Sequence, residues 1–438
     1  MLALEGGARV VPEGAIAPWP PITDADRDAV LRALDASTPW HWPMRAVQDL
    51  EAAWAEFTGM RHALAANSGT AALHMCVAAC GVEPGDEVLV PADTFLASAS
   101  CVLQANAIPV FVDVDPVTYN LDPDRIEERV TERTRAIVAV DLNGLPADYD
   151  RLRAVARRHD LHVIEDGAQA HGATYKGRPV GALGDLASCS LNGSKCLSAL
   201  AEGGLFTTDD DRWRDNAARV LMFGEELKGQ SREYNARIMG WNYRLDPLEA
   251  AFARSQLQRL PEMSRVRSAN GAHLSRALAD VPGVRTPVVP EGSTHVYFFY
   301  PLLVEPEALG LDASEVPPAA FRRALKAALR AEGLAIDEWQ LQPVPGQTLF
   351  QELRGYGRGC PWSCGHARPG VGYRPQEYPV ALDICERRLV MGASFSSFGP
   401  PNGTGLMDLY AEAFHKVLVD HRAALVELAR RDGGERGA

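Results

Sequence analysis

The fold of this chain is decided by the stretch Leu161-His162-Val163-Ile164-Glu165-Asp166-Gly167-Ala168-Gln169. Its apolar first half predicts a buried strand, and the two carboxylates come where that strand ends. Further along, a second short apolar run is followed by Ser190-Leu191-Asn192-Gly193-Ser194-Lys195. The sequence therefore places an acid at the end of one strand, and a hydroxyl and an amine after a later strand.

These three groups are the ones that an enzyme dependent on pyridoxal phosphate needs. A lysine amine such as that of Lys195 forms a Schiff base with the cofactor aldehyde. A carboxylate such as that of Asp166 keeps the pyridine nitrogen protonated, so that the ring accepts electrons. The hydroxyl of Ser190 can bind the phosphate. We therefore expect pyridoxal 5'-phosphate as the cofactor, with Lys195 and Asp166 as the catalytic residues.

Short apolar runs alternate with helical segments on both sides of this stretch. We expect strands at His62–Ala66, Glu87–Val90, Val110–Val114, Ala136–Val140, Leu161–Ile164, Ala187–Ser190 and Gly204–Thr207. The expected helices include Asp24–Leu34, Ala46–Phe57, Thr70–Cys80, Ala97–Ala105, Pro123–Val130 and Tyr149–His159. This alternation predicts an α/β fold with a mostly parallel sheet covered by helices on both faces. Ligands bind such sheets at the carboxyl ends of the strands, which is where the motifs fall.

The length of the chain favours more than one domain. We expect an N-terminal arm at 1–43, a large cofactor-binding domain at 44–260 and a small C-terminal α+β domain at 261–438. One long helix, Leu245–Leu260, should lead out of the large domain. The small domain should contain a strand within His295–Val304, a helix at Pro318–Glu332, a loop at Gln340–Gly372, a final helix at Met407–Arg430 and a disordered tail at Arg431–Ala438.

The composition is that of an ordinary globular protein, with 46% hydrophobic and 23% charged residues. The formal net charge of −13 argues against a nucleic-acid partner, because phosphate binding draws on clustered Lys and Arg. No apolar run reaches the roughly 20 residues that span a bilayer, and residues 1–16 lack the pattern of a signal peptide. We therefore expect a cytoplasmic protein with no nucleic-acid and no membrane partner.

The cysteines include one group that resembles a metal site. Cys360 and Cys364 lie four positions apart, and His366 follows them. A zinc site takes four protein ligands, or three and a water molecule, and no convincing fourth ligand is near in the sequence. We therefore expect no metal here, and a Gly- and Pro-rich loop whose cysteines are incidental.

Six motifs in order resemble the DegT/DnrJ/StrS-type sugar aminotransferases, which are fold type I pyridoxal phosphate enzymes. They are Asn67-Ser68-Gly69-Thr70-Ala71-Ala72-Leu73, Pro91-Ala92-Asp93-Thr94-Phe95, Glu165-Asp166-Gly167-Ala168-Gln169-Ala170, Ser190 to Lys195, Ala201-Glu202-Gly203-Gly204 and Gly240-Trp241-Asn242-Tyr243-Arg244. The resemblance is densest from about residue 54 to residue 260. It implies that Lys195 both holds the cofactor and moves the substrate proton.

The resemblance also assigns cofactor contacts to single residues. It implies that the phosphate is held by Gly69, Thr70 and Ser190, that the ring lies under Phe95, that the ring hydroxyl meets Gln169, and that Asn242 reaches the phosphate of a second subunit. The last contact implies a homodimer with shared active sites. Taken alone, each residue also has a structural explanation, such as helix capping at Ser68 or core packing of Phe95. The roles of His171 and Arg244 stay open between structure and substrate binding.

The chain departs from the family at the end of its fourth strand. Asp141-Leu142-Asn143-Gly144 stands where many members carry His-Leu-Tyr-Gly, which puts a substrate contact in doubt. The runs Ala170-His171-Gly172-Ala173 and Gly359-Cys360-Pro361 resemble most the branch that aminates keto-cyclitols of the scyllo-inosose type in aminoglycoside pathways, and the aminohydroxybenzoate synthases close to it. The cyclitol enzymes of that branch take the amino group from glutamine.

We therefore expect transfer of an amino group from L-glutamine or L-glutamate to a keto-sugar, keto-cyclitol or aminoglycoside intermediate in antibiotic biosynthesis. One alternative is a nucleotide-sugar aminotransferase, although the acidic balance and the lack of an obvious basic loop weigh against a diphosphate site. A second is a dehydratase similar to the aminohydroxybenzoate synthases. Lys195 favours transamination, because members that dehydrate sugars carry His there. A third alternative is a catalytically silent scaffold subunit.

Overall fold

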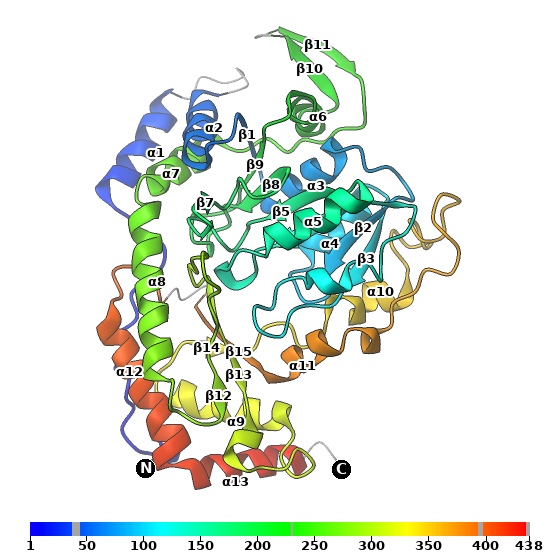
Figure 1. Ribbon diagram of the computed structural model, residues 1–438. Helices are drawn as coiled ribbons and strands as arrows, with labels where there is room; N and C mark the ends of the chain where they lie inside the picture. Colours follow the sequence, from blue (N-terminus) through cyan, green and yellow to red (C-terminus); the bar gives the residue numbers. More distant parts are fainter. Residues whose placement is uncertain (37–43, 229–230, 393–396, 435–438) are drawn as a thin grey trace.

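The computed structural model describes residues 1–36, 44–228, 231–392 and 397–434. A seven-stranded sheet with the strand order β1-β9-β8-β5-β4-β2-β3 forms its centre (Figure 1). The strands are β1 (His62–Ala66), β2 (Glu87–Pro91), β3 (Ile108–Val112), β4 (Thr134–Val140), β5 (His162–Asp166), β8 (Leu186–Ser190) and β9 (Gly204–Thr208). The pairs from β3 to β8 are parallel, and β9 runs antiparallel to both β8 and β1. The seven predicted strands and the mostly parallel α/β sheet are thus confirmed.

Helices cover both faces of this sheet, because its strands carry apolar residues on both sides. One face packs against α3 (Gly69–Ala79), α4 (Ala97–Gln104) and α6 (Asp211–Leu221). The other packs against α2 (Arg45–Thr58), α5 (Tyr149–His159) and α7 (Pro247–Leu257). The sheet lies between the two apolar layers, and polar residues such as Asp166 and Ser190 stand at the carboxyl ends of its strands.

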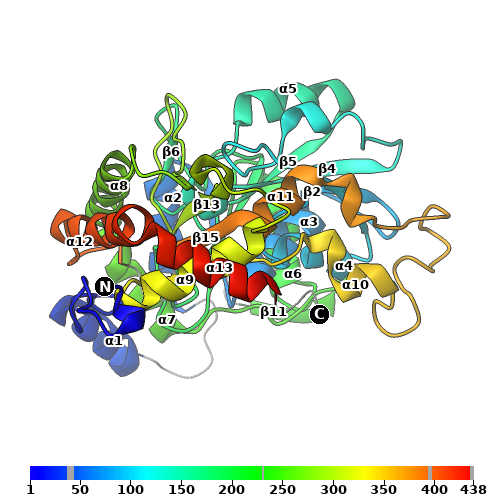
Figure 2. The same cartoon turned by 90° about the horizontal axis from the view of Figure 1, so that it is seen from below.

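A second, antiparallel sheet is built by the C-terminal part of the chain (Figure 2). Its order is β12 (Val284–Arg285), β13 (Phe299–Val304), β15 (Arg388–Gly392) and β14 (Ile336–Asp337). Its core is shared with α8 (Leu260–Ala277), α9 (Pro318–Ala331), α12 (Thr404–His415) and α13 (Arg422–Gly434). Leu2 and Val11 of the N-terminal arm are buried in the same core. The exact domain bounds stay a prediction.

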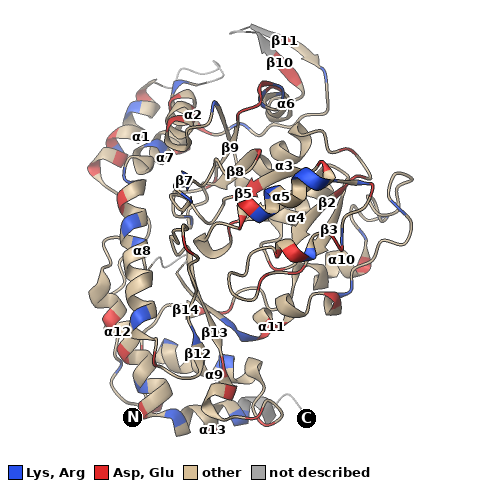
Figure 3. Cartoon of the chain, viewed as in Figure 1, with Lys and Arg blue, Asp and Glu red and all other residues tan. Residues whose placement is uncertain are grey.

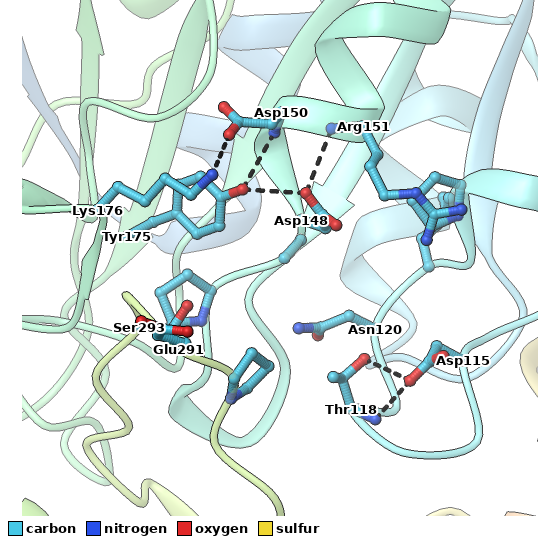
Figure 4. A pocket seen from close by; sticks show the side chains of 15 residues that line it. Asp115, Thr118, Asn120, Asp148, Asp150, Arg151, Tyr175, Lys176, Glu291 and Ser293 are labelled. Atoms are coloured by element: carbon cyan, nitrogen blue, oxygen red, sulfur yellow. Dashed lines mark hydrogen bonds and ion pairs between the residues drawn. The ribbon is translucent and has the colours of Figure 1, made fainter.

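The other helices and hairpins complete the described part of the chain. They are α1 (Asp24–Ala36), the hairpins β6 (Thr174–Tyr175) with β7 (Arg178–Pro179) and β10 (Glu225–Lys228) with β11 (Ser231–Ala236), α10 (Thr348–Glu352) and α11 (Pro379–Arg387). Acidic and basic residues are mixed along α1, whereas α8 carries Glu262 in its first turn followed by Arg265, Arg267 and Arg276 (Figure 3). No described helix is both long enough and apolar enough to cross a membrane.

Three predicted helices differ from the structure. The prediction of a helix at Pro123–Val130 is wrong beyond one 3-10 turn, Pro123–Arg125, because only Pro123 and Ile126 offer buried anchors there. The predicted helix Leu245–Leu260 begins only at Pro247, as α7, and ends at Leu257; Pro261, which has no N–H to donate, lies at the start of α8.

The predicted final helix Met407–Arg430 is also interrupted. A π-helical turn, Lys416–Asp420, separates α12 from α13, and the N–H of His421 donates to the carbonyl of Lys416 at 3.0 Å. Lys416 Nζ at this turn binds the carbonyl of Ala8 at 2.7 Å and Glu332 at 2.8 Å, so the turn anchors the N-terminal arm. The prediction of a disordered tail is wrong up to Gly434, which ends α13, and residues 435–438 lie outside the described residues.

Candidate active site

Seven of the eight predicted site residues line one cavity of about 420 Å³ at the carboxyl ends of the strands. These seven are Gly69, Thr70, Phe95, Asp166, Gln169, Ser190 and Lys195. They lie at the ends of β5 and β8 or in the segments that follow β1, β2, β5 and β8, so the parallel topology is what brings them together. The eighth residue, Asn242, is exposed and lies outside this cavity.

One end of the cavity is the N-terminus of α3. Ser68 caps this helix by accepting a 3.0 Å hydrogen bond from the N–H of Ala71, which is the structural explanation for the motif. The N–H groups of Gly69 and Thr70 still precede the first intrahelical bonds and suit an anion. A Cβ on Gly69 would lie 2.6 Å from Ser190 Cβ, so glycine is what lets the end of β8 approach this turn.

The floor of the cavity is the carboxylate of Asp166, which is 5% exposed. Its Oδ2 accepts a 2.7 Å hydrogen bond from Ser98 Oγ, and its Oδ1 accepts one of 3.2 Å from the N–H of Ala168. Ser98 in turn shares a 2.9 Å hydrogen bond with Thr94. Burial raises the pKa of Asp166, and the Ser98 hydrogen bond opposes that rise. A cation beside this carboxylate would therefore be strongly favoured.

Lys195 reaches the same cavity from the turn after β8. Its ammonium nitrogen lies 4.4 Å from the centre of the Phe298 ring. Burial lowers the pKa of Lys195, and the charge of Asp166 partly counteracts this. A lowered pKa makes the neutral amine more abundant near neutral pH, and the neutral amine is the form that acts as a nucleophile or base.

Gln169, in the cavity wall, is hydrogen-bonded to Asn143, which belongs to the run at 141–144 where the sequence departs from the family pattern. Gln169 Oε1 accepts a 2.7 Å hydrogen bond from the N–H of Asn143, so the amide NH2 group of Gln169 is what remains for a ligand oxygen. Asn143 adopts a left-handed backbone (φ 61°) and its side chain is 1% exposed. The turn therefore acts here as a support for Gln169.

Phe95 and Asn242 occupy exposed positions. The side chain of Phe95 is 56% exposed at the cavity. Asn242 Oδ1 accepts a 2.8 Å hydrogen bond from Arg244 Nε, and its carbonyl accepts one of 3.2 Å from Asn67. Arg244 thus holds the side chain of Asn242. His171 does not line the cavity: it is fully buried against Trp54, and burial lowers its pKa to about 3.

Sequence reasoning missed several residues of this site. Ser98 lies in the first turn of α4, whereas Thr94 lies in the segment between β2 and that helix, so no helical spacing signals the hydrogen bond between their hydroxyls. Phe298 and Trp339 also line the cavity, and they come from the C-terminal part of the chain. No local motif marks these aromatic residues.

The cysteines of the Gly- and Pro-rich loop are not incidental. Cys360 and Cys364 form a disulfide with Cα atoms 5.5 Å apart, which corrects the expectation from sequence. Between them, Trp362 is buried and its Nε1 donates to Tyr373 at 2.9 Å. Tyr373 Oη in turn donates to the carbonyl of Pro109 in β3 at 2.9 Å, so the disulfide closes a turn that is anchored in the core beside β3.

Comparisons with known proteins agree with the geometry. The model of the DegT/DnrJ/EryC1/StrS aminotransferase family matches residues 21–363. The L-glutamine:2-deoxy-scyllo-inosose aminotransferase of Micromonospora echinospora is 35% identical over 425 residues, or 92% of this chain and 94% of that protein. The GDP-perosamine synthase of Caulobacter vibrioides is 41% identical over 283 residues, or 64% of this chain and 75% of that protein. The crystal structure of a 3-amino-5-hydroxybenzoic acid synthase aligns with a TM-score of 0.78 at 28% identity, covering 92% of this chain and 99% of that one.

Proposed function

We propose that this chain, which belongs to the DegT/DnrJ/EryC1/StrS family of pyridoxal phosphate-dependent aminotransferases, transfers an amino group from L-glutamine or L-glutamate to a keto-cyclitol. The proposal includes keto-sugars and aminoglycoside intermediates as related acceptors, and it places the reaction in antibiotic biosynthesis. The observation that carries the chemistry is the cavity in which Lys195 faces the buried carboxylate of Asp166.

The described residues fit the cofactor of this family. The turn at Gly69 and Thr70 and the hydroxyl of Ser190 would hold the phosphate, and Asp166 would hold the protonated ring nitrogen. Gln169 would bind the ring oxygen through its amide NH2 group, and Phe95 would cover one face of the ring. When bound, the cofactor supplies an electron sink and carries the amino group between the two substrates.

The protein groups then have separate tasks. Ser98 Oγ keeps Asp166 Oδ2 ionised by donating to it, so that the positive charge of the ring nitrogen has a partner. Lys195 Nζ, with its pKa lowered by burial, would accept a proton from the amino-bearing carbon of the donor and, in the second half of the reaction, would deliver a proton to the former carbonyl carbon of the acceptor. The rings of Phe298 and Trp339 exclude water from that side of the cavity.

The choice of acceptor rests on the extent of similarity. The match to the inosose aminotransferase spans 92% of the chain, whereas the match to the perosamine synthase spans 64%. Residues of the C-terminal part, Phe298 and Trp339, line the cavity here, so similarity that includes this part supports a shared acceptor class. A nucleotide-sugar acceptor is the second candidate, and the 41% identity to the perosamine synthase favours it.

We also propose that the enzyme is a homodimer with shared sites. Asn242 is exposed, lies outside its own cavity and is held in place by Arg244, as expected of a residue that reaches a partner's phosphate. The hairpin β10–β11 extends away from the sheet (Figure 1) and offers a second surface for a partner. Size-exclusion chromatography with light scattering should give twice the mass of one chain, and a single-chain mass would contradict the shared site.

A panel of acceptors tests the proposed substrate class. The enzyme, loaded with cofactor and supplied with L-glutamine, is incubated separately with scyllo-inosose, 2-deoxy-scyllo-inosose and a GDP-linked 4-keto sugar. Mass spectrometry should detect the aminated cyclitol and little aminated nucleotide sugar. Preference for the nucleotide sugar would establish the second candidate. Loss of water from an acceptor without amination would instead indicate a dehydratase.

A further inference from the structure

The N-terminal arm reaches the catalytic segment at Trp19. Trp19 Nε1 donates a 3.1 Å hydrogen bond to the backbone carbonyl of Lys195. The family match begins at residue 21, so Trp19 lies outside the part of the chain that defines the family. A contact between the arm and the backbone of Lys195 is therefore a feature of this chain that the family assignment does not explain.

The arm is fixed on both sides of Trp19. Before it, the N–H of Ala17 donates to Asn402 Oδ1 at 3.0 Å. After it, the carbonyl of Pro21 accepts hydrogen bonds from Gln256 and Arg259, both at 3.4 Å. The indole is thus held between two anchors, one on the C-terminal part of the chain and one at the junction of α7 and α8. A donor held in this way can constrain the group that it binds.

A buried cation completes the support of the indole. The guanidinium of Arg267, a residue that is 1% exposed, lies 4.4 Å from the centre of the Trp19 ring. Arg267 Nη1 also donates at 3.4 Å to the carbonyl of Tyr297, the residue before Phe298. Phe298 in turn lies over the ammonium of Lys195. Trp19 therefore contacts the backbone of Lys195 and Phe298 contacts its side chain. Arg267 contacts both Trp19 and Tyr297, the residue next to Phe298.

We propose that Trp19 is a positioning residue for Lys195. By fixing the Lys195 carbonyl, it restricts the rotation of the backbone from which the amine extends, so that Nζ stays directed into the cavity. This proposal rests on the proposed role of Lys195 in the reaction. Trp19 touches neither cofactor nor substrate in this account, and it acts through the lysine.

The test is the Trp19→Phe variant, which keeps an aromatic ring for Arg267 and removes the donor. Pyridoxal phosphate is mixed with cofactor-free protein, and the rate at which the visible band of the lysine-bound cofactor appears is followed by stopped flow. Loss of one hydrogen bond of ordinary net strength should slow this rate about five-fold. Turnover should fall by a similar factor with KM for glutamine nearly unchanged, and the thermal midpoint should stay within a few degrees.

Trp213→Phe is the matched control, because Trp213 is also half-buried but packs against His162, away from the cavity. In Trp213→Phe, the visible band of the lysine-bound cofactor should form at the wild-type rate. An unchanged rate in Trp19→Phe, an equal slowing in the control, or a Trp19→Phe protein that unfolds would overturn the positioning role. A wild-type protein that forms no band would overturn the proposed function as well, so the two failures are distinguishable.

Discussion

Replacing Ser98 by alanine should move the loss of activity in acid to a higher pH. Asp166 accepts a hydrogen bond of 2.7 Å from Ser98 Oγ and a longer one, of 3.2 Å, from the N–H of Ala168. Burial already raises the pKa of Asp166, and the Ser98 bond is the largest effect that opposes the rise. Among the protein groups around Asp166, the Ser98 hydroxyl therefore favours the ionised carboxylate most.

The size of the effect follows from the strength of such a bond. A hydrogen bond to a charged group contributes about 1.5 to 3 kcal/mol. Its loss should shift the ratio of protonated to ionised Asp166 about ten-fold to a hundred-fold towards the protonated form. The ionised form is the active one, so activity is lost as pH falls through the pKa of Asp166. Because the variant raises that pKa, its activity should fail at a higher pH than that of the wild type.

The assay is the pH profile of the glutamine half-reaction, followed as bleaching of the visible band. Ser98→Ala should lose activity at a higher pH than the wild type and bind cofactor more weakly, while Ser98→Thr, which keeps a hydroxyl, should resemble the wild type. Ser100→Ala on the same helix is the control, because the Ser100 hydroxyl donates to the carbonyl of Ala97 at 3.4 Å and has no described hydrogen bond to Asp166. If Ser98→Ala and wild type lose activity at the same acidic pH, the Ser98 hydroxyl does not keep Asp166 ionised.

Three other substitutions test separate parts of the account. Lys195→Ala should stay folded by circular dichroism but form no visible band with pyridoxal phosphate and show no measurable transfer; retained turnover would exclude Lys195 from the chemistry. Gly69→Ala should weaken cofactor binding about ten-fold or more, since its Cβ would lie 2.6 Å from Ser190 Cβ; an unchanged dissociation constant in a fluorescence titration would show that this turn does not hold the phosphate. Arg388→Met should lower the free energy of unfolding by about 3 to 5 kcal/mol, because it leaves Asp93 as a buried charge without its ion-pair partner. Urea unfolding measures this loss, and adding Asp93→Leu should restore part of it; a single variant as stable as wild type would contradict the buried pair.

The sheet and most of the site could be predicted because each depends on local sequence. Each of the seven strands is a short apolar run next to a turn, and β5 and β8 carry their polar residues at the ends. Parallel strands end at one edge, so residues as distant as Gly69 and Lys195 could be placed together without coordinates. No local sequence pattern indicates that β9 runs antiparallel to its neighbours β8 and β1.

Other features depend on contacts between distant segments. Phe298, just before β13, and Trp339, just after β14, line the cavity, and Trp19 reaches Lys195 across 176 positions of sequence. Such contacts follow from how the parts of the chain pack, and single-sequence patterns do not contain that information. The break between α7 and α8 was foreseeable, because Pro261 interrupts the helical pattern. The π-helical turn between α12 and α13 was not, since its residues continue that pattern.

A complete amino transfer at the cavity of Lys195 can be followed in a single visible absorption experiment. The purified protein with pyridoxal phosphate should show a yellow absorption band that bleaches when L-glutamine is added. The band should return when 2-deoxy-scyllo-inosose follows, because the acceptor takes the amino group and restores the original cofactor. A band that glutamine and glutamate both leave unchanged, or one that the keto-cyclitol does not restore, would contradict the proposed reaction.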